Sequence, residues 1–473
     1  MRKIPPVGWP IVLVAALVTP NALKALLFGI RRSLRQRAIE DAERRLTFRL
    51  PDFKLARSRD VVDRLMADPA VLEAVEIHAR EHGEPRAEVM RRAERYAREV
   101  VPSFSPYLYF RVGLPLAGLL SRTLYRLGSE GERVEGDATV VFVMNHRSNL
   151  DYVILANLMR DQAALSFAAG EWARAWPIGG FVSAMGSFFV RRGSGEPLHR
   201  RVLERFVRMA VEGGLTQVIF PEGGLSRDGR PREPKVGLLD YMLRGFDPSS
   251  DRDVLFVPVA VNYDRVLEDR TLLASLKPGA RGPNDRLILS QAACFVYHNL
   301  RLAMSGAWDR RPYAVVNFGV PVSARRYAFT RSLDFRAMGE EARAGEVEML
   351  AQELMRTAGE LVPVLPIPAI AHVLVSSLEE ALTGSEIRAR VHALTASLES
   401  RGVLVLLPGG EREVEAGLDL LVARRMVLKE DDLYRISPRE AGLLRYYAAS
   451  ISHLIEYDWD EGATSHGGSM KSR

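Results

Sequence analysis

The chain has 473 residues, a length that suits two or three domains. Its composition is 47% hydrophobic and 26% charged, which is typical of a chain that buries a core and excludes wholesale disorder and coiled coil. The mean hydropathy of −0.06 argues against a polytopic membrane protein. A single cysteine, Cys294, excludes an intrachain disulfide and a cysteine-based zinc site.

The positive charge of the chain lies at its N-terminus. The formal net charge is +6, and the first 50 residues hold ten basic and three acidic residues, so the remainder is close to neutral. Residues 7–30 are mostly apolar and long enough to cross a bilayer, and an arginine cluster follows at 31–37. These features predict a membrane-associating segment at 1–37, on the cytoplasmic face of the cell membrane. Pro20 favours a bent or shallow anchor, and a signal peptide or a buried helix are the alternatives.

Residues 38–128 predict a highly charged helical region. Its clearest helix spans 68–82, where Asp68 is a suitable N-cap and Pro69 occupies the first helical position. An apolar stretch at 106–127 is interrupted by arginines. This stretch suits either a helix on a bilayer surface or a helix in the core.

Strands alternate with helices from 129 to 330. The expected strands are apolar runs rich in β-branched residues, at 139–144, 187–190, 216–221, 254–261 and 313–320. A helical pattern lies between two of them, at 198–212. This alternation predicts an α/β domain with a largely buried sheet flanked by helices. The remaining residues, 331–473, predict a mainly helical region that ends in the helix–helix–wing order of a small winged-helix unit.

The sharpest motif is N-H-R-S-N-L-D-Y at 145–152, directly after the first expected strand. A polar loop that joins the C-terminal end of a strand to a helix is where α/β sheets build their sites. His146 is suited to act as a general base near neutral pH, and Asp151, at the start of the next helix, can hold its imidazole. No G-x-S-x-G motif supplies a protein nucleophile, so the pair predicts direct activation of a substrate hydroxyl.

Two further loops carry groups that suit an anion. G-S-F-F-V-R-R at 186–192 ends a strand with two guanidiniums that can hold a phosphate. I-F-P-E-G-G-L-S-R at 219–227 forms a glycine-containing turn whose backbone amides can approach an anion. The residues expected to bind substrate or shape the pocket are Arg191, Arg192, Glu222, Gly223, Ser226, Arg227 and Lys235. A last block, V-P-V-A-V-N-Y-D-R-V-L-E at 257–268, is another strand that enters a loop.

These four blocks, in this order, resemble the glycerolipid acyltransferase superfamily, whose signature is H-x-x-x-x-D. Within it the sequence is most similar to the glycerol-3-phosphate and dihydroxyacetone-phosphate acyltransferases. The resemblance includes N-F-G-V-P-V at 317–322 and is weaker beyond residue 330. It implies a mixed sheet flanked by helices, with an N-terminal membrane-associating helical region and a small C-terminal helical, winged-helix-like region.

The resemblance also implies an activity. A fatty acyl group would pass from acyl-CoA or acyl carrier protein to the sn-1 hydroxyl of glycerol 3-phosphate, the first step of phospholipid synthesis. His146 would deprotonate that hydroxyl, Asp151 would orient His146, and the basic loops would hold the phosphate. The thioester is a co-substrate, so no cofactor and no metal are implied. The expected partners are the polyol phosphate, the acyl donor and membrane phospholipid.

Alternatives remain at the level of substrate and of class. Leu225 stands where the family usually has an arginine, so one expected phosphate ligand is missing unless position 225 only packs in the core. Dihydroxyacetone phosphate and lysophosphatidate are therefore alternative acceptors. A non-catalytic membrane or nucleic-acid binding protein is the alternative class. The intact pair of His146 and Asp151 argues against it, and no nucleic acid is expected as a partner.

Overall fold

The structure is a computed structural model that describes residues 50–131, 138–170, 178–191, 196–250, 252–276, 311–377, 381–407 and 410–455, with a few isolated residues besides. The apolar part of the predicted membrane segment, 7–30, lies outside the described residues. Among those that are described, no helix combines the length and the apolar character that crossing a bilayer requires.

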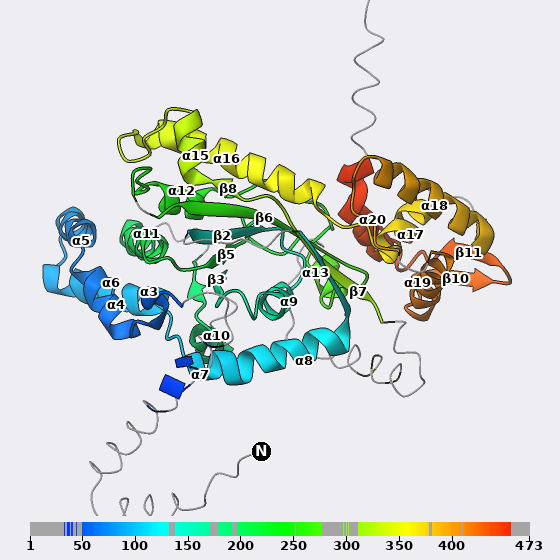
Figure 1. Cartoon of the computed structure of the whole chain (residues 1–473), viewed down its shortest axis with the longest axis horizontal. Helices are drawn as coiled ribbons and strands as arrows, with labels where there is room; N and C mark the ends of the chain where they lie inside the picture. The colour runs from blue at the N-terminus through cyan, green and yellow to red at the C-terminus, as the bar shows by residue number, and fades with distance from the viewer. Residues whose placement is uncertain are drawn as a thin grey trace, which may run out of the picture.

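A mixed eight-stranded sheet forms the centre of the molecule (Figure 1). Its strand order is β1-β7-β6-β2-β5-β3-β4, and β8 pairs with β6. Strands β2 to β6 run parallel, whereas β7 is antiparallel to β6 and β1 is parallel to β7. The strands span Arg126–Glu130 (β1), Thr139–Met144 (β2), Ser166–Ala169 (β3), Phe188–Phe189 (β4), Gln217–Ile219 (β5), Val254–Tyr263 (β6), Tyr313–Phe318 (β7) and Val322–Ser323 (β8). The mixed, helix-flanked sheet predicted from the sequence is confirmed.

Helices cover both faces of the sheet. They are α3 (Asp52–Leu55), α4 (Ser58–Met66), α5 (Pro69–His82), α6 (Arg86–Val100), α7 (Pro106–Leu108), the π-helix η1 (Tyr109–Gly113), α8 (Leu114–Leu124), α9 (Asp151–Leu158), α10 (Ile178–Ala184), α11 (Pro197–Glu212), α12 (Gly237–Leu243), α13 (Asp269–Ala274), α15 (Ala324–Thr330), α16 (Glu340–Glu360) and α17 (Pro366–Ser376). A C-terminal unit adds β9 (Leu382–Thr383), α18 (Gly384–Ser400), α19 (Glu411–Ala423), β10 (Val427–Glu430), β11 (Leu433–Ile436) and α20 (Ala441–Ile455).

The alternating side chains of β2 explain why helices pack on both faces of the sheet. Side chains of a strand point to opposite faces in turn. Val141 and Val143 are fully buried in the core that α11, α12 and α16 close, while Phe142 and Met144 face the core shared with α9, α17 and α20. A strand that is apolar on both faces must be covered on both, which is why β2 lies inside the sheet.

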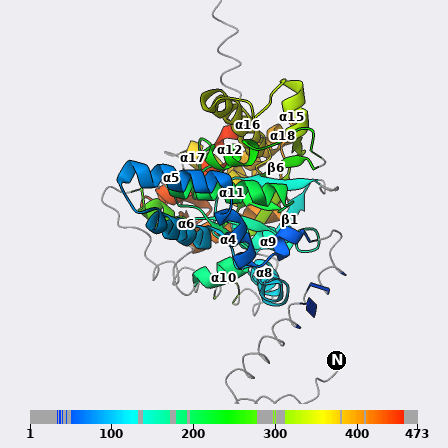
Figure 2. The ribbon, with the colours of Figure 1, turned by 90° about the vertical axis from the view of Figure 1, so that its left-hand side faces the viewer.

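The N-terminal helices α4, α5 and α6 pack beside α11, on the side of the molecule seen in Figure 2. Asp68 connects α5 to α11. One of its carboxylate oxygens caps α5 by accepting the backbone N–H of Ala70 at 2.9 Å, as the sequence predicted, and the other accepts the Arg205 guanidinium of α11. The cap and the ion pair therefore use the same carboxylate.

The C-terminal region shares a core with the sheet. Helices α17 and α20 bury Ile370, Leu444 and Tyr447 in the same cluster as β6 and β7. Asn262 of β6 donates to the carbonyl of Pro363 at 2.9 Å, and the backbone N–H of Ile367 donates to Asp264 at 2.8 Å. Beyond α17 the order strand, two helices and hairpin matches the predicted helix–helix–wing arrangement.

Three strands of the central sheet, β1, β3 and the two-residue β8, were not predicted from the sequence, and three predicted strands are shorter in the structure, including the one at 313–320, which ends at Phe318. Strand β1 is polar because it lies at the edge of the sheet, and β3 has only four residues, two of them alanine. The strand predicted at 216–221 ends at Ile219, because Gly223 donates back to the Phe220 carbonyl and begins a turn. The strand predicted at 187–190 is reduced to Phe188–Phe189.

The shared core predicts that the sheet and the C-terminal region unfold together. Ile370 of α17 is fully buried, so Ile370→Ala should lower the free energy of unfolding by about 2–5 kcal/mol. Denaturant unfolding followed by far-UV circular dichroism and by fluorescence should shift as one transition. Val320→Ala, at a side chain that is 80% exposed, should leave the midpoint unchanged. Two separate transitions, with only one shifted, would contradict the shared core.

Candidate active site

Three loops meet at the C-terminal ends of β2, β5 and β6. They follow Met144, Ile219 and Tyr263, and β2 lies between the other two strands. From β2 the chain proceeds to β3 on one side, and it later returns to β6 on the other. The site is thus the point where the strand order reverses, the usual place for a binding site in an open α/β sheet.

His146 and Asp151 form a buried hydrogen-bonded pair. The imidazole Nδ1 lies 2.9 Å from Oδ2 of Asp151, and the two side chains are 3% and 0% exposed. Because a carboxylate can only accept here, Nδ1 carries the proton and Nε2 is left with a lone pair. The pair that the sequence predicted is therefore present, in the tautomer that a general base requires.

Four donors converge on the Asp151 carboxylate. Besides the imidazole, Oδ2 accepts the backbone N–H groups of Arg147 and Ser148 at 2.8 and 3.1 Å. The other oxygen accepts the hydroxyl of Tyr263, from the end of β6. These bonds fix the direction in which Asp151 presents its oxygen to His146, since the carboxylate cannot rotate without breaking them.

Aromatic side chains enclose the imidazole. Phe220 stacks on it with ring centroids 4.1 Å apart, and Tyr152 meets it edge-on at 5.5 Å. The Tyr152 hydroxyl lies 3.4 Å from Nε2. Tyr152 is inside the N-H-R-S-N-L-D-Y motif, yet no sequence feature indicated a role for it. Its place at Nε2 puts it next to any hydroxyl that the base would deprotonate.

The loop after β2 is held by residues on β6 and just beyond it. The Asn145 side chain exchanges two hydrogen bonds with the backbone of Val261, at 2.8 and 3.1 Å. Glu268 accepts the hydroxyl of Ser148 at 2.7 Å and the backbone N–H of Asn149 at 3.2 Å. Glu268 is the last residue of the fourth sequence block, and its position explains why that block accompanies the histidine motif.

Arg147 connects the site to the C-terminal region. The residue is 4% exposed, and its guanidinium donates to the carbonyl of Gly229 and lies 4.9 Å from the ring of Tyr446 on α20. Gly229 has φ = +93°, and a Cβ there would lie 2.0 Å from the Tyr446 carbonyl oxygen. The loop after β5 therefore rests directly on α20. Tyr446 lies 300 residues from His146, so no local sequence signal could have indicated this contact.

Glu222 and Gly223 form the turn after β5. Glu222 is 2% exposed, and its Oε2 has no hydrogen-bond partner among the described residues. Burial raises the pKa of Glu222 to about 8, although Arg147 and Arg232 oppose the shift. Gly223 has φ = +69°, and the Lys235 side chain lies across it. The turn thus places the exposed Lys235 side chain across Gly223, next to a buried carboxyl group that accepts a hydrogen bond from the backbone of His146.

The other predicted phosphate ligands are arranged differently. Arg227 and Lys235 are exposed on the loop after β5. Ser226 is buried, and its hydroxyl donates to the Arg230 carbonyl and accepts from Gly229, which stabilises the loop itself. Arg191 pairs with Glu99 of α6 through two hydrogen bonds of 2.6 Å. Arg192 lies outside the described residues.

Leu225 packs against the core that contains α17 and α20. The position is therefore occupied by an apolar contact. A long cationic side chain there would have to leave that core or bury its charge. The structure thus supports the packing interpretation of the departure from the family pattern at 225.

An apolar cavity of about 250 Å³ adjoins the site. It lies between α8, α9, α10 and the strands β3 and β4, and Tyr152 and Phe167 are among its lining residues. The two rings touch each other and Tyr152 also touches His146, so part of the cavity lining lies against the imidazole. No sequence motif marked this cavity, because its described lining residues come from four separate stretches of the chain.

The raised pKa of Glu222 predicts a pH dependence of stability. Between its ordinary value near 4.5 and about 8, the folded state holds a proton that the unfolded state has lost. Stability attributable to this group therefore falls as the pH rises through that window. From about pH 6 to about pH 8.5, the urea midpoint of the wild type should fall more than that of Glu222→Gln. Glu233→Gln, on the exposed part of the same loop, serves as the control. If the urea midpoints of the wild type and of Glu222→Gln fall equally with pH, the raised pKa of Glu222 is refuted.

Comparison with known proteins identifies two matching regions. Residues 126–262 match the family described as Acyltransferase, and residues 313–455 match the Glycerol-3-phosphate acyltransferase C-terminal region. The first contains β1 to β6 and the whole histidine loop. The second contains β7 and the helices, α17 and α20, that close the shared core.

Curated relatives extend the match across most of the chain. A glycerol-3-phosphate acyltransferase of Aeromonas hydrophila is 28% identical over 420 residues, which is 85% of this chain and 50% of the relative. One of Actinobacillus succinogenes is 27% identical over 424 residues, with the same coverage of 85% and 50%. The chain thus spans about half the length of the curated relatives it matches. The crystal structure of the 1-acyl-sn-glycerophosphate acyltransferase of Thermotoga maritima matches with 16% identity and a TM-score of 0.29, covering 61% of this chain and 94% of that one.

Proposed function

The chain belongs to the glycerol-3-phosphate acyltransferase family, and we propose that it transfers a fatty acyl group to the sn-1 hydroxyl of glycerol 3-phosphate. The observation that carries the proposal is the His146–Asp151 pair, buried beside an apolar cavity at the point where the strand order reverses. The pair provides a general base, and the cavity provides space for a chain of methylene groups.

The reaction follows from the lone pair on Nε2 of His146. Nε2 takes the proton of the acceptor hydroxyl while the oxygen attacks the thioester carbonyl. The imidazolium then donates its Nε2 proton to the departing thiolate, so the thiol leaves and the ester remains. Asp151 holds the imidazole by Nδ1 in both stages and stabilises the positive charge that forms in between.

The phosphate of the acceptor is assigned to the loop after β5. Arg227 and Lys235 are exposed there, and Arg232 lies close enough to act electrostatically on Glu222. A dianionic phosphate is well matched to such a group of cations. Arg191, which is paired with Glu99, is better suited to fixing α6 against the sheet than to binding substrate.

The acyl donor is a thioester of coenzyme A or of acyl carrier protein, and its chain enters the cavity lined by α8, α9 and α10. Tyr152, which lines the cavity and contacts the imidazole, lies where the thioester carbonyl and the acceptor hydroxyl meet. The enzyme acts at the cytoplasmic face of the membrane. The basic, apolar character of residues 1–37 and the exposed apolar side chains of α8 support this location.

Loss of the base is the direct test. His146→Ala should lower the rate of acyl transfer to glycerol 3-phosphate by about 10²–10⁴, since that is the usual contribution of a general base. Asp151→Asn should also lose much of its activity, because an amide favours the wrong tautomer of the imidazole. The assay uses purified protein in detergent with both donor types. His392→Ala, at an exposed histidine on α18, is the matched control.

The same assay identifies the preferred acceptor substrate. Glycerol 3-phosphate, dihydroxyacetone phosphate and a lysophosphatidate are compared at equal concentration, and glycerol 3-phosphate should be used best. Preference for lysophosphatidate would reassign the substrate but keep the base. Near-normal turnover by a folded His146→Ala variant would overturn the mechanism itself.

The cavity predicts a chain-length effect. Ala156 of α9 lines it, so Ala156→Phe should fill part of the space and shift the preference toward shorter acyl chains. The ratio of kcat/KM for a long and a short saturated donor should fall by about one order of magnitude, because several methylene groups lose their burial. Ala389→Phe, at an exposed position on α18, should leave the ratio unchanged. An equal loss for all chain lengths would mean that the chain binds elsewhere.

A further inference from the structure

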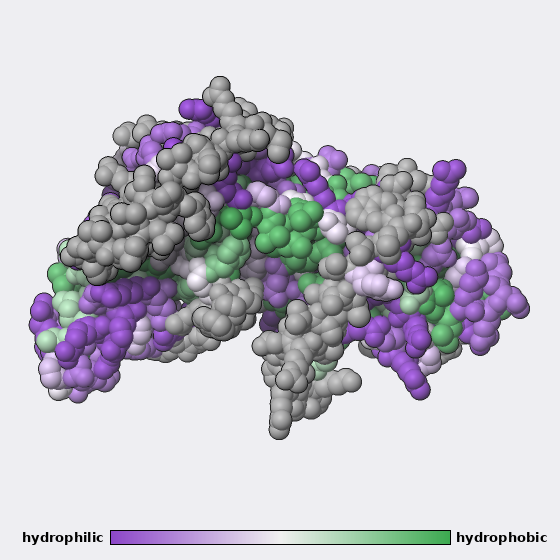
Figure 3. Space-filling model, turned by 90° about the horizontal axis from the view of Figure 1, so that it is seen from below, coloured by the Kyte–Doolittle hydropathy of each residue, from purple (hydrophilic) through white to green (hydrophobic). Residues whose placement is uncertain are grey.

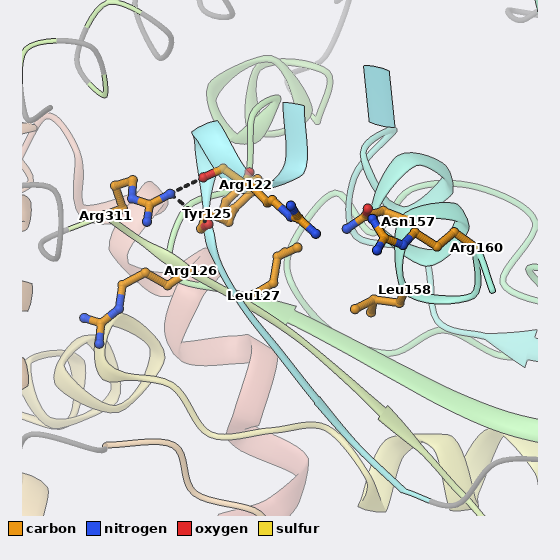
Figure 4. Close-up of a pocket in the computed structure, with 8 residues that line it drawn as sticks. All are labelled: Arg122, Tyr125, Arg126, Leu127, Asn157, Leu158, Arg160 and Arg311. Atoms are coloured by element: carbon orange, nitrogen blue, oxygen red, sulfur yellow. Dashed lines mark hydrogen bonds between the residues drawn. The ribbon is translucent and has the colours of Figure 1, made fainter. Parts of the chain in front are cut away.

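A second cavity, of about 610 Å³, lies at the β1 edge of the sheet (Figure 4). It is open to the surface and is lined by the end of α8, the start of β1 and the end of α9. Among the described residues that line it, four are arginines and none is acidic; they are Arg122, Tyr125, Arg126, Leu127, Asn157, Leu158, Arg160 and Arg311. None of these residues belongs to the site around His146, so the positive charge of this cavity has no role in the reaction above.

Two of the arginines are available to a ligand. The guanidinium of Arg122 makes no hydrogen bond or ion pair with any residue that the structure describes, and in Figure 4 it extends toward Asn157. Among the described residues, Arg160 donates only to its neighbour Asp161, at 3.2 Å, in an exposed pair that contributes little. By contrast, Arg126 is paired with Glu413 at 2.9 Å, and its side chain points away from Arg122 in Figure 4.

Asn157 supplies an independent sign of a ligand. Its side chain is 7% exposed, and its Oδ1 has no hydrogen-bond partner among the described residues. A buried amide oxygen without a partner costs free energy. A ligand that carries both a phosphate and a hydroxyl would satisfy the whole cluster. The phosphate would accept from Arg122 and Arg160, and the hydroxyl would donate to Asn157.

The surface that leads to the cavity is apolar. Val112, Leu116 and Leu119 are 39%, 42% and 65% exposed, and their spacing places them on one face of the helix. Arg122 continues that stripe one turn further. Figure 3 shows hydrophobic residues gathered at the centre of this side of the molecule, which in Figure 1 carries α8 and α10. An apolar stripe that ends in an arginine suits the boundary between hydrocarbon and headgroup.

We propose that this arginine pocket binds the headgroup of an anionic phospholipid that carries a hydroxyl, with phosphatidylglycerol as the type. The apolar stripe of Val112, Leu116 and Leu119 lies against the hydrocarbon. A free phosphate would use the arginines but would leave the stripe without a function. The inference rests on the membrane contact proposed above and not on acyl transfer.

The test is binding of dihexanoyl phosphatidylglycerol, as a monomer, to the full chain by calorimetry. The double variant Arg122→Ala/Arg160→Ala should weaken binding by about two orders of magnitude, since each charge-assisted hydrogen bond contributes roughly tenfold or more. Leu119→Asp should weaken it several-fold. The control Arg59→Ala/Arg98→Ala removes two exposed helix arginines that pair within their own helices, and it should bind as the wild type does.

Two comparison ligands show whether the pocket binds a lipid headgroup or a free phosphate. Dihexanoyl phosphatidylcholine and inorganic phosphate should each bind at least tenfold more weakly than the glycerol lipid. Inorganic phosphate binding equally well, with Leu119→Asp unchanged, would assign the pocket to a free anion and overturn the proposal. Wild-type affinity in the double variant would overturn it as well.

Measurements of KM separate the proposed lipid site from the proposed acyl transfer. In detergent, the double variant should keep the wild-type KM for glycerol 3-phosphate and for the acyl donor. A raised KM for either substrate would show that the pocket serves the reaction and not a lipid. Absence of acyl transfer in the wild type, together with intact lipid binding, would leave the lipid site standing and remove only the proposed activity.

Discussion

A fully buried carboxylate, Asp151, is the constraint on which the site depends. Burying a charge is costly unless hydrogen bonds replace its water, and Asp151 receives them from its own loop, from His146 and from Tyr263. These donors come from the loop between β2 and α9 and from the end of β6. The loop conformation, the end of β6 and the imidazole position are therefore set together. A change at any one of them alters the base, even without touching it.

Arg147 makes a second set of buried polar contacts, between the loop after β2 and the C-terminal region. Arg147, which is 4% exposed, donates through Nη1 to the Gly229 carbonyl and lies over the Tyr446 ring, while its Nε and Nη2 have no hydrogen-bond partner among the described residues. Asp269 repeats the arrangement nearby, accepting both the Tyr447 hydroxyl and Arg424 of the C-terminal unit. Buried polar contacts of this kind specify one docking position, whereas the apolar core between α17 and the sheet supplies most of the attraction. The C-terminal region thus forms part of the structural support of the site.

How far the sequence predicts this structure depends on the range of each interaction. The histidine loop was predictable because its strand, its polar residues and its acid lie within about fourteen residues of one another. The helix at 68–82 was predictable from its cap. Residues that act across the fold were not: Tyr263 is recognised only when β6 lies beside β2, and Tyr446 only when α20 covers the loop after β5. Ser226 shows the converse, because a donor that suited an anion in sequence is used to hold its own loop.

The shared core has a consequence for how the chain is made. Strand β2 emerges from the ribosome well before α17 and α20, the helices that cover one of its faces. During that interval Phe142, Met144 and the apolar face of β6 are not yet covered by these helices. This exposed hydrophobic surface can aggregate with other nascent chains. Synthesis must therefore proceed through most of the polypeptide before the base acquires its surroundings. A chaperone that shields this face, or a slow translation step after β7, would act on the yield of folded protein without changing any residue of the site.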